Sequence, residues 1–441
     1  KVQIQLRGFI LEMENFETGI EFADLLDRED PLAQHRSFFR IPEETIYMLG
    51  NSLGLISGPA HQSVERVLDE WRRLGIGGWL GGNPPWFWMA ENAGKTAAPL
   101  VGARPDEVVC TGTTTYNIHS LVSTFYKPSG ERTRIVAAAD DFSSDLYALK
   151  SQIALHGLDW REQLVMVESG QDRLTDESSV EEVLTEKVAL ALIPSVFYRS
   201  SQLVDIERLT AAAHEAGAII GFDCSHSVGV VPHRFARVDV DFALWCGYKY
   251  LCGGPGAPAF LYINRRHFSR QPGLAGWFGN KKETQFDLSP DFDHSRSAGG
   301  WQISSPGILG AAGVEGALEV ILDAGIERIR DKSLKMTSYL IFLADEILGD
   351  QPYGFQVITP RQPERRGGHV ALARDRDAIR IKESLAARSV VADFRPPDII
   401  RLAPSPLYNT YREIREVVRI IKEIIDSGEY KSASEDRKII S

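Results

Sequence analysis

The middle of the chain alternates short apolar runs with helical patterns, and this alternation restricts the possible folds more than any other feature. The runs typical of buried strands cover residues 134–139, 188–193, 218–223, 242–246 and 259–263. One helical pattern, with leucine and alanine on one face, fills residues 205–216 between two of these runs. Strands separated by helices predict βαβ units and a largely parallel sheet that is covered on both faces. Such a sheet binds ligands at the carboxyl ends of its strands.

The C-terminal part of the chain has a different secondary-structure pattern. From about Ser305, long helical patterns dominate, followed by a strand-like run at 367–373 and a helix near 376–387. Thr410 and Glu413 form a capping box at the start of a closing amphipathic helix. We therefore expect a second, smaller α+β unit at this end of the chain.

The length of the chain, 441 residues, exceeds the size that one hydrophobic core usually supports. We expect an α/β protein with a large domain at 61–305 that carries the mostly parallel sheet. A smaller α+β domain is expected at 306–430, joined by the N-terminal segment 1–60. Residues 431–441 are charged and poorly patterned, which predicts a frayed tail.

Charge and composition argue against several function classes. The formal net charge of −11 opposes nucleic-acid binding, which needs a basic face, and gives no attraction to anionic lipid. No apolar run approaches the roughly 20 residues of a membrane span, and the first residues lack a secretory signal pattern. The four cysteines fit neither a disulfide framework nor a zinc site, and the histidines are not spaced as metal ligands. These features predict a cytoplasmic enzyme or binding protein without a metal.

Lys249 lies just past a predicted buried strand, in a stretch rich in glycine and proline. Such a lysine is positioned to form a Schiff base, although for Lys249 taken alone a surface lysine beside a turn is the better explanation. Asp223 lies 26 residues upstream, at the end of a neighbouring predicted strand. A pyridinium nitrogen needs a carboxylate partner of this kind, although an aspartate there is also a common helix cap. Together the two residues predict pyridoxal phosphate, held on Lys249 and paired with Asp223.

A phosphate site is predicted where residues 111–115, rich in threonine, follow a strand-like run and lead into a helix. Free N–H groups at a helix N-terminus favour an anion. An ordinary helix cap explains the same pattern, so it gains weight only beside Lys249 and Asp223. Phe142 follows another predicted strand, where its ring could stack on a pyridine or pack in the core. Asp145 could cap the next helix or reach the cofactor.

Arg401 interrupts an apolar run in the predicted small domain. A buried arginine is costly unless it is paired, and its planar guanidinium suits a substrate carboxylate. An internal salt bridge is the alternative interpretation of this residue.

Eight motifs, in their order and spacing across most of the chain, resemble those of the kynureninase family. They cover residues 49–55, 142–148, 196–199, 222–229, 239–243, 247–258, 276–279 and 400–409. The resemblance implies a fold-type-I pyridoxal-phosphate enzyme of the aminotransferase class V superfamily. It also implies a homodimer in which each active site lies at the subunit interface.

The resemblance implies roles for individual residues. Lys249 would carry the cofactor, Asp223 would pair with its ring nitrogen, and Tyr248 would lie near the phosphate and shuttle protons. Arg401 would hold the substrate α-carboxylate. The other cofactor-binding residues would be Thr114, Thr115, Phe142, Asp145, His226, Ser305 and, from the second subunit, Trp277. The other substrate-binding residues would be Asn51, Ser52, Trp79 and Phe278.

Two positions depart from the family pattern. Ser305 stands where family members carry a threonine or asparagine, and Pro194 stands where a small hydroxyl residue is usual. Trp79 and Phe278 resemble the aromatic pocket residues of bacterial members, since the animal enzymes have a histidine in place of Trp79. These differences concern the aryl part of the substrate rather than the cofactor.

The implied reaction is hydrolysis of L-kynurenine, or of its 3-hydroxy form, to L-alanine and anthranilate or 3-hydroxyanthranilate. Tryptophan breakdown, NAD biosynthesis and secondary metabolism are all pathways compatible with this reaction, and the sequence does not decide among them. The nearest alternative is another fold-type-I enzyme, such as an aminotransferase or a desulfurase-like lyase. A desulfurase needs a mobile cysteine, whereas all four cysteines lie in or beside predicted strands. A catalytically idle cofactor-binding protein is a third possibility, but such a protein would not need Arg401 to bind a substrate carboxylate.

Overall fold

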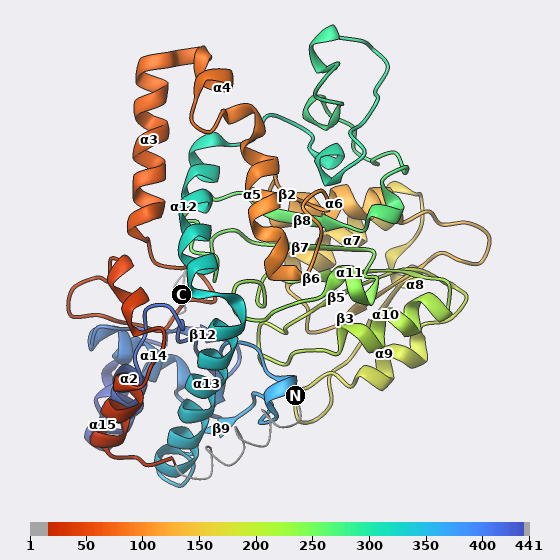
Figure 1. Ribbon diagram of the computed structural model, residues 1–441. Coiled ribbons are helices and arrows are strands. Elements are labelled where there is room, and N and C mark those ends of the chain that lie inside the picture. Colours follow the sequence, from red (N-terminus) through yellow and green to blue (C-terminus); the bar gives the residue numbers. More distant parts are fainter. Residues whose placement is uncertain (1–15, 436–441) are drawn as a thin grey trace.

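The structure is a computed structural model that describes residues 16–435, and residues 1–15 and 436–441 lie outside the described residues. The start of the N-terminal segment and most of the expected tail therefore lie outside it. In the described part, two main sheets each carry a hydrophobic core. The larger sheet lies right of centre in Figure 1, and the smaller, C-terminal sheet lies at the lower left.

The larger sheet has seven strands in the order β2-β8-β7-β6-β5-β3-β4. The strands are β2 Val108–Cys110, β3 Arg134–Ala138, β4 Leu164–Val167, β5 Val188–Pro194, β6 Ile219–Asp223, β7 Phe242–Trp245 and β8 Phe260–Ile263. The neighbours from β7 to β4 pair in parallel, whereas β8 runs antiparallel to both β7 and β2. The prediction of an α/β fold with a mostly parallel sheet is confirmed.

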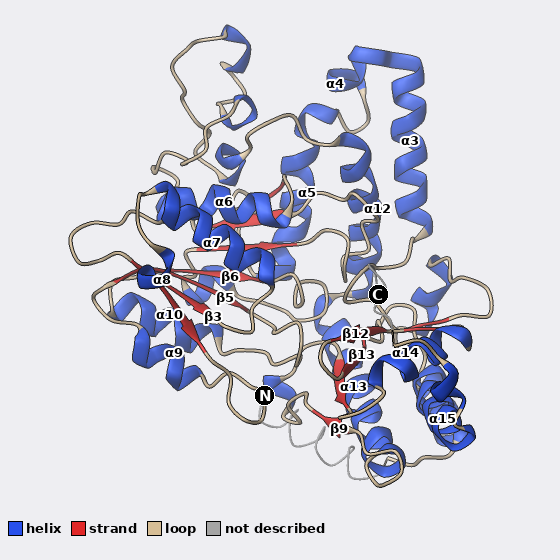
Figure 2. Ribbon diagram, turned by 180° about the vertical axis from the view of Figure 1, so that it is seen from behind, coloured by secondary structure: helices blue, strands red, loops and turns tan. Residues whose placement is uncertain are grey.

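Helices cover both faces of this sheet. In β5, Leu190 and Leu192 enter one core, whereas Ala191 and Ile193 enter the other, because side chains along a strand point alternately to opposite faces. Helices α6 and α7 pack on the first face, and α9 and α10 pack on the second (Figure 2). The helices between the strands are α6 Thr114–Phe125, α7 Ser143–Leu155, α8 Trp160–Gln163, α9 Glu177–Val183, α10 Ile206–Glu215 and α11 Phe235–Val238.

Two long helices, α3 and α12, stand side by side beside this sheet (Figure 1). Gly316 of α12 allows the close approach, because a Cβ at this position would lie 2.2 Å from the carbonyl oxygen of Pro59 in α3. Val314 and Leu318 of α12 belong to the core of the larger sheet. The helices of this region are α3 Gly58–Leu74, α4 Gly78–Gly81, α5 Met89–Ala97 and α12 Ile308–Ala324.

The smaller sheet has the order β12-β13-β10-β9 and is antiparallel at each pairing. Its strands are β9 Gln356–Val357, β10 Val370–Ala373, β12 Asp393–Arg395 and β13 Ile399–Leu402. The helices of this part are α2 Ile20–Arg28, α13 Ile326–Leu348, α14 Ala378–Ala387 and α15 Tyr411–Ser427. A separate parallel pair joins β1 Ile46–Tyr47 to β11 Val390–Val391.

The N-terminal helix α2 packs on α15 within the smaller core. The carboxylate of Asp27 in α2 accepts a hydrogen bond of 2.6 Å from the backbone N–H of Tyr411. The capping box of Thr410 and Glu413 is present at the start of α15, as predicted. The exact domain boundaries near 60 and 305 remain predictions.

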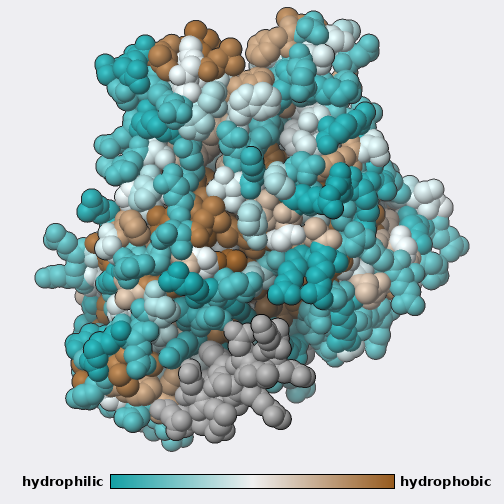
Figure 3. Space-filling model, in the orientation of Figure 1, coloured by the Kyte–Doolittle hydropathy of each residue, from teal (hydrophilic) through white to brown (hydrophobic). Residues whose placement is uncertain are grey.

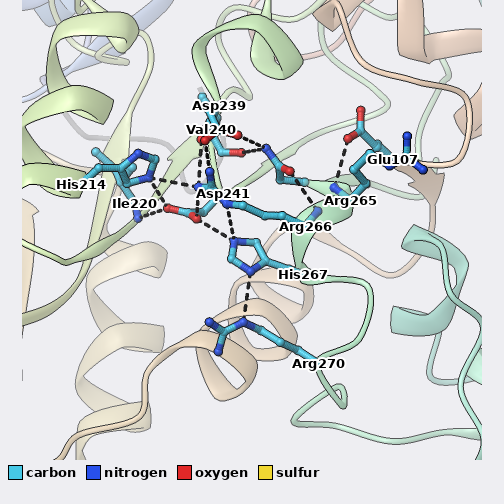
Figure 4. Close-up of polar contacts among 11 residues, drawn as sticks. Glu107, His214, Ile220, Asp239, Val240, Asp241, Arg265, Arg266, His267 and Arg270 are labelled. Atoms are coloured by element: carbon cyan, nitrogen blue, oxygen red, sulfur yellow. Dashed lines mark hydrogen bonds and ion pairs between the residues drawn. The ribbon is translucent and has the colours of Figure 1, made fainter.

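A buried carboxylate, that of Asp241, lies just before β7 and makes hydrogen bonds to residues around the amino ends of β6 and β7 (Figure 4). It contacts Nε2 of His214 at 2.9 Å and Nε2 of His267 at 2.7 Å. It also accepts a hydrogen bond of 2.9 Å from the backbone N–H of Ile220 and pairs with Arg266. Although burial alone would raise the pKa of Asp241, these hydrogen bonds hold it below its ordinary value. The opposite, carboxyl ends of the same strands carry the candidate site.

Between residues 16 and 435, no helix combines the length and apolar character that a membrane crossing requires. In the same range, no group of three or more His, Cys, Asp or Glu side chains is arranged to hold a metal ion. All four cysteines are buried and free.

Candidate active site

A cavity of about 220 Å³ lies at the carboxyl ends of β6 and β7, where the strand pattern predicts a site. Strand β13 of the smaller sheet contributes Arg401 to its wall. The lining residues are Asn51, Ser52, Thr114, Thr115, Phe142, Ser144, Asp145, Tyr198, Asp223, Ser225, His226, Cys246, Tyr248, Lys249, Arg395 and Arg401. They include every predicted site residue except Trp79, Trp277, Phe278 and Ser305.

Lys249 and Asp223 reach the cavity from neighbouring strands. Asp223 is the last residue of β6, and its carboxylate accepts a hydrogen bond of 2.7 Å from the backbone N–H of Ser225. Lys249 lies in the turn after β7, and its Nζ is 3.0 Å from Nε2 of His226. Burial, reinforced by the charges of Lys249 and Arg401, holds the pKa of His226 well below its usual range. The ring of His226 is therefore neutral.

Two further carboxyl groups lie beside Asp223. Asp145, in the first turn of α7, is 1% exposed, and its Oδ2 has no hydrogen-bond partner among the described residues. Burial raises the pKa of Asp145 well above its usual range, and the charge of Asp223 raises it further. Burial and Asp223 have the same effect on the pKa of Asp141. Because neighbouring buried carboxyl groups do not all ionise, we expect Asp145 and Asp141 to hold protons.

The N-terminus of α6 forms one end of the cavity with Thr114 and Thr115. Thr113, at the N-cap position, makes no side-chain capping hydrogen bond, so backbone N–H groups of the first turn stay available to an anion. The hydroxyl of Thr115 lies 2.6 Å from the hydroxyl of Ser144, at the start of α7. The hydroxyl of Thr114 lies 3.0 Å from Sγ of Cys246. This end of the cavity suits a phosphate group.

Aromatic rings form another part of the wall. The ring of Phe142 is 49% exposed and meets that of Tyr198 edge-on, with 5.7 Å between ring centroids. Phe142 therefore presents an open ring face rather than core packing. Burial raises the pKa of Tyr248, with smaller contributions from Cys246 and Asp223. The phenol of Tyr248 thus keeps its proton at neutral pH.

Arg401 is fully buried and forms an internal salt bridge with Asp393. Its Nε donates to Asp393 Oδ1 at 2.7 Å, its Nη2 pairs with Asp393 Oδ2, and its Nη1 donates to the carbonyl oxygen of Tyr198 at 2.6 Å. The salt bridge that the sequence left as an alternative is present. Arg401 nevertheless lines the cavity, and two of its five N–H groups remain for a ligand.

The predicted residues outside the cavity fall into two places. Phe278 lies 5.8 Å from Trp79 and 5.7 Å from Trp277, measured between ring centroids. Trp277 is 46% exposed. Ser305 lines a separate cavity of about 360 Å³ between the start of α6 and the start of α12. A single chain does not bring these four residues to Lys249.

Four of the residues that sequence reasoning did not assign to the site bear on its charges and rings. Tyr198 and Arg395 line the cavity, and Asp393 binds Arg401. His369 is buried, and its ring centroid is 5.9 Å from that of His226. Tyr198 lies inside residues 196–199, a motif used for the family resemblance, so the sequence could have indicated it as a site residue. The other three depend on long-range packing.

These residues fit pyridoxal phosphate. Buried polar atoms without partners in the described chain, Asp145 Oδ2 and His226 Nδ1, lie among residues of the cavity wall and call for a polar ligand or water. An open aromatic face, a helix N-terminus, an amine and a carboxylate surround the same space. A phosphorylated pyridine aldehyde matches each of these groups.

Comparison with known proteins decides the family. A sequence model of the kynureninase C-terminal domain matches residues 329–421. A kynureninase of Geobacillus thermodenitrificans is 48% identical over 425 residues, which are 96% of this chain and 99% of the relative. A kynureninase of Shouchella clausii is 46% identical over 421 residues, covering 96% of this chain and 98% of the relative. The chain belongs to the kynureninase family.

Solved structures with lower identity share the fold. A cysteine desulfurase from Thermococcus onnurineus has a TM-score of 0.74 and 19% identity, covering 92% of this chain and 98% of the other. A cystine C–S lyase, solved with its product cysteine persulfide, has a TM-score of 0.75 and 16% identity, covering 86% and 98%. At this identity the likeness concerns the fold alone. The kynureninase resemblance of the motifs is confirmed, together with the fold class that it implied.

Proposed function

We propose that this chain is a pyridoxal-phosphate-dependent hydrolase that cleaves the Cβ–Cγ bond of L-kynurenine, or of its 3-hydroxy form. The products would be L-alanine and anthranilate or 3-hydroxyanthranilate, as a step of tryptophan catabolism. The observation that carries the proposal is the 48% identity to a kynureninase over 96% of the chain. The cavity that joins Lys249, Asp223 and Arg401 agrees with it.

The cofactor would be held by residues from three elements. Lys249 would bind its aldehyde carbon, and Asp223 would pair with its ring nitrogen. Thr114 and Thr115 would meet the phosphate at the N-terminus of α6, with Phe142 stacked on the ring. When bound, pyridoxal phosphate supplies an electron sink for negative charge that develops on the substrate carbon atoms.

Protons would be handled by Lys249 and Tyr248. Once the substrate amine has taken its place, the Nζ of Lys249 would be free to accept the Cα proton. The neutral Nε2 of His226, 3.0 Å away, accepts a hydrogen bond from Nζ and so fixes its direction. Tyr248 keeps its phenolic proton. It would donate this proton to Cβ when the Cβ–Cγ bond breaks.

The two carboxyl groups beside Asp223, those of Asp145 and Asp141, would leave Asp223 as the partner of the cofactor's ring nitrogen. If Asp145 and Asp141 hold protons, Asp223 is the carboxyl group left to pair with the pyridine nitrogen. The ring nitrogen would then meet one well-placed negative charge.

We also propose that the chain forms a cytoplasmic homodimer with shared sites. Exposed apolar side chains lie at the tips of two projections, at Ile76 and Leu80 near α4 and at Phe286 and Leu288 in the 277–300 segment. Figure 3 has hydrophobic surface at the top of the molecule, where both projections end. A second copy that covered these tips could bring Trp277 and Ser305 to the other subunit's cavity, which a single chain leaves without them.

The alternatives are less well supported. A desulfurase needs an accessible, mobile cysteine, whereas all four cysteines are buried. An aminotransferase would need a 2-oxo acid and would leave no aromatic amine. An idle binding protein would have no use for the buried charges of the cavity wall, which are costly to retain.

Product analysis tests the proposed function. The holoenzyme should convert L-kynurenine to fluorescent anthranilate and L-alanine in equal amounts, without added 2-oxo acid. Parallel assays with 3-hydroxykynurenine would give the preferred substrate. Persulfide formation from cysteine, or turnover that depends on a 2-oxo acid, would favour the alternatives instead.

A further inference from the structure

Arg401, the residue expected to bind the substrate α-carboxylate, already has its positive charge balanced by a buried carboxylate, Asp393. Asp393 lies opposite Arg401 in the register of β12 and β13 and binds it through two hydrogen bonds. Arg401 is 1% exposed and Asp393 is fully buried. Although burial alone would raise the pKa of Asp393, the hydrogen bonds and charge of Arg401 hold it below its ordinary value. The pair is therefore a carboxylate and a guanidinium whose charges cancel.

A second guanidinium stands at the same place. Arg395, two residues after Asp393 on β12, donates a hydrogen bond of 2.9 Å from Nη2 to Asp393 Oδ2. Its side chain is 23% exposed and lines the cavity together with Arg401. Its Nε is buried and has no hydrogen-bond partner among the described residues.

The three side chains together hold one unit of positive charge. Asp393 is the sole ion-pair partner of Arg395 within residues 16–435, and both of its carboxylate oxygens already bind Arg401. The nearby Asp398 is bound by both terminal nitrogens of Arg173. Arg395 is thus not needed to satisfy Asp393, and its charge is not cancelled.

An uncancelled charge against a buried ion pair is costly unless it meets an anion. Burial and the charge of Arg401 lower the pKa of Arg395. This lowering shows that its surroundings disfavour the charged guanidinium. The cavity wall is where the charge is exposed, so the anion that would offset it is a ligand of the cavity.

We propose that Arg395 is a specificity-determining residue that supplies the net positive charge recognised by the α-carboxylate of the amino-acid substrate. Arg401, held rigid by Asp393 and by the carbonyl oxygen of Tyr198, provides directed N–H groups, and Arg395 provides the charge. The inference rests on the proposed function, because that function supplies an α-amino acid as the ligand.

The test compares an amino acid with its uncharged amide. Binding of L-alanine and of L-alaninamide to the holoenzyme is read from the change that each causes in the visible absorbance of the bound cofactor. The ratio of the two Kd values measures how strongly the site recognises negative charge. The variants are Arg395→Gln, Arg395→Lys and a distant control, Arg361→Gln, which removes an exposed pairing with Asp345.

The proposal predicts that the wild type binds L-alanine at least tenfold more tightly than L-alaninamide. Arg395→Gln should weaken L-alanine binding about tenfold or more and leave L-alaninamide within about twofold, so the ratio collapses. Arg395→Lys, which keeps the charge, should recover most of the ratio, and Arg361→Gln should keep all of it. Arg395→Met replaces Arg395→Gln if the latter does not fold.

A wild-type ratio that persists in Arg395→Gln or Arg395→Met would overturn the proposal. An equal loss for both ligands would also overturn it, since that result means general damage to the site. The proposed function is judged separately, by anthranilate release from L-kynurenine in the wild type. An active wild type with an unchanged ratio in the variants would refute the role of Arg395 and leave the function intact.

Discussion

Nζ of Lys249 lies 3.0 Å from Nε2 of His226, within a wall of the cavity that also holds Asp223. The ring of His226 is neutral, because burial and the charges of Lys249 and Arg401 lower its pKa. A neutral ring is able to accept a hydrogen bond from the amine without adding a positive charge beside it. The pair thus combines an amine that can move a proton with a neighbour that orients it.

Substitutions of His226 test this orienting role. His226→Phe removes the acceptor and should lower kcat about 100-fold, in the range typical of groups that assist proton transfer. His226→Gln keeps an acceptor near Nζ and should lose about tenfold at most. Steady-state kinetics on L-kynurenine gives both values. Equal activity of the Phe and Gln variants would show that the hydrogen bond has no part in the reaction.

Asp145 and Asp223, two neighbouring carboxyl groups of the site, should respond differently to amide substitution. Asp145→Asn mimics the protonated acid that burial imposes and should keep kcat within about tenfold of the wild type. Asp223→Asn removes the anion that faces the ring nitrogen and should lower kcat by about 100-fold or more. Kinetics of the two matched variants, with cofactor content measured by absorbance, checks the assignment. A reversed order of the two effects would mean that Asp145 carries the charge.

Buried histidines should make the protein sensitive to acid. Burial lowers the pKa of His233 to about 3, below an ordinary value of 6.5. The stabilising effect of a lowered histidine pKa is complete above pH 6.5 and is lost as pH falls toward the folded value. The free energy of unfolding should therefore fall by up to about 1.4 kcal/mol per pH unit below 6.5 for this residue.

Urea denaturation at pH 7.5, 6.0 and 5.0 measures this slope. His233→Gln should reduce the dependence of the free energy of unfolding on pH by up to about 1.4 kcal/mol per pH unit. Substitution of the exposed His61 should leave this dependence unchanged. His226 and His369, whose pKa values are also lowered by burial, account for acid sensitivity that remains. A slope in His233→Gln as steep as that of the wild type would contradict the burial argument.

The buried pair of Arg401 and Asp393 should be structurally costly to break. Asp393→Asn leaves the guanidinium of Arg401 buried without a counter-charge and should lower the free energy of unfolding by about 3 kcal/mol. The exposed pair of Arg361 and Asp345 is a matched control, and Asp345→Asn should cost less than about 1 kcal/mol. Denaturation curves for the two variants compare them directly. Similar losses would mean that burial adds nothing to the first pair.

Local pattern was enough to predict most strands of the larger sheet and the residues at their ends, although the edge strand β4 was not predicted. Asp223 and the Lys249 turn follow apolar runs that become β6 and β7, and parallel strands bring their carboxyl ends to one edge. The capping box at Thr410 needed only four adjacent residues. These features depend on short-range rules of backbone geometry and burial.

Other parts of the site arise from contacts between distant segments, which local pattern does not contain. Asp393 meets Arg401 because β12 and β13 pair in one register, and a shift of one residue would separate them. His369 reaches His226 across the two sheets. Trp277 and Ser305 were predicted by family resemblance, yet a single chain does not bring them to the cavity, which agrees with the proposed homodimer.

The central claim is that Lys249 drives cleavage of a kynurenine-type substrate, and one measurement tests it most directly. L-kynurenine is added to the wild type and to Lys249→Ala, both reconstituted with pyridoxal phosphate, and anthranilate fluorescence is followed with time. The wild type should release anthranilate continuously, and the variant should be slower by a factor of about 1,000 or more, with the absorbance band of lysine-bound cofactor lost. A variant that kept both the band and the wild-type rate of anthranilate release would contradict the assignment of Lys249.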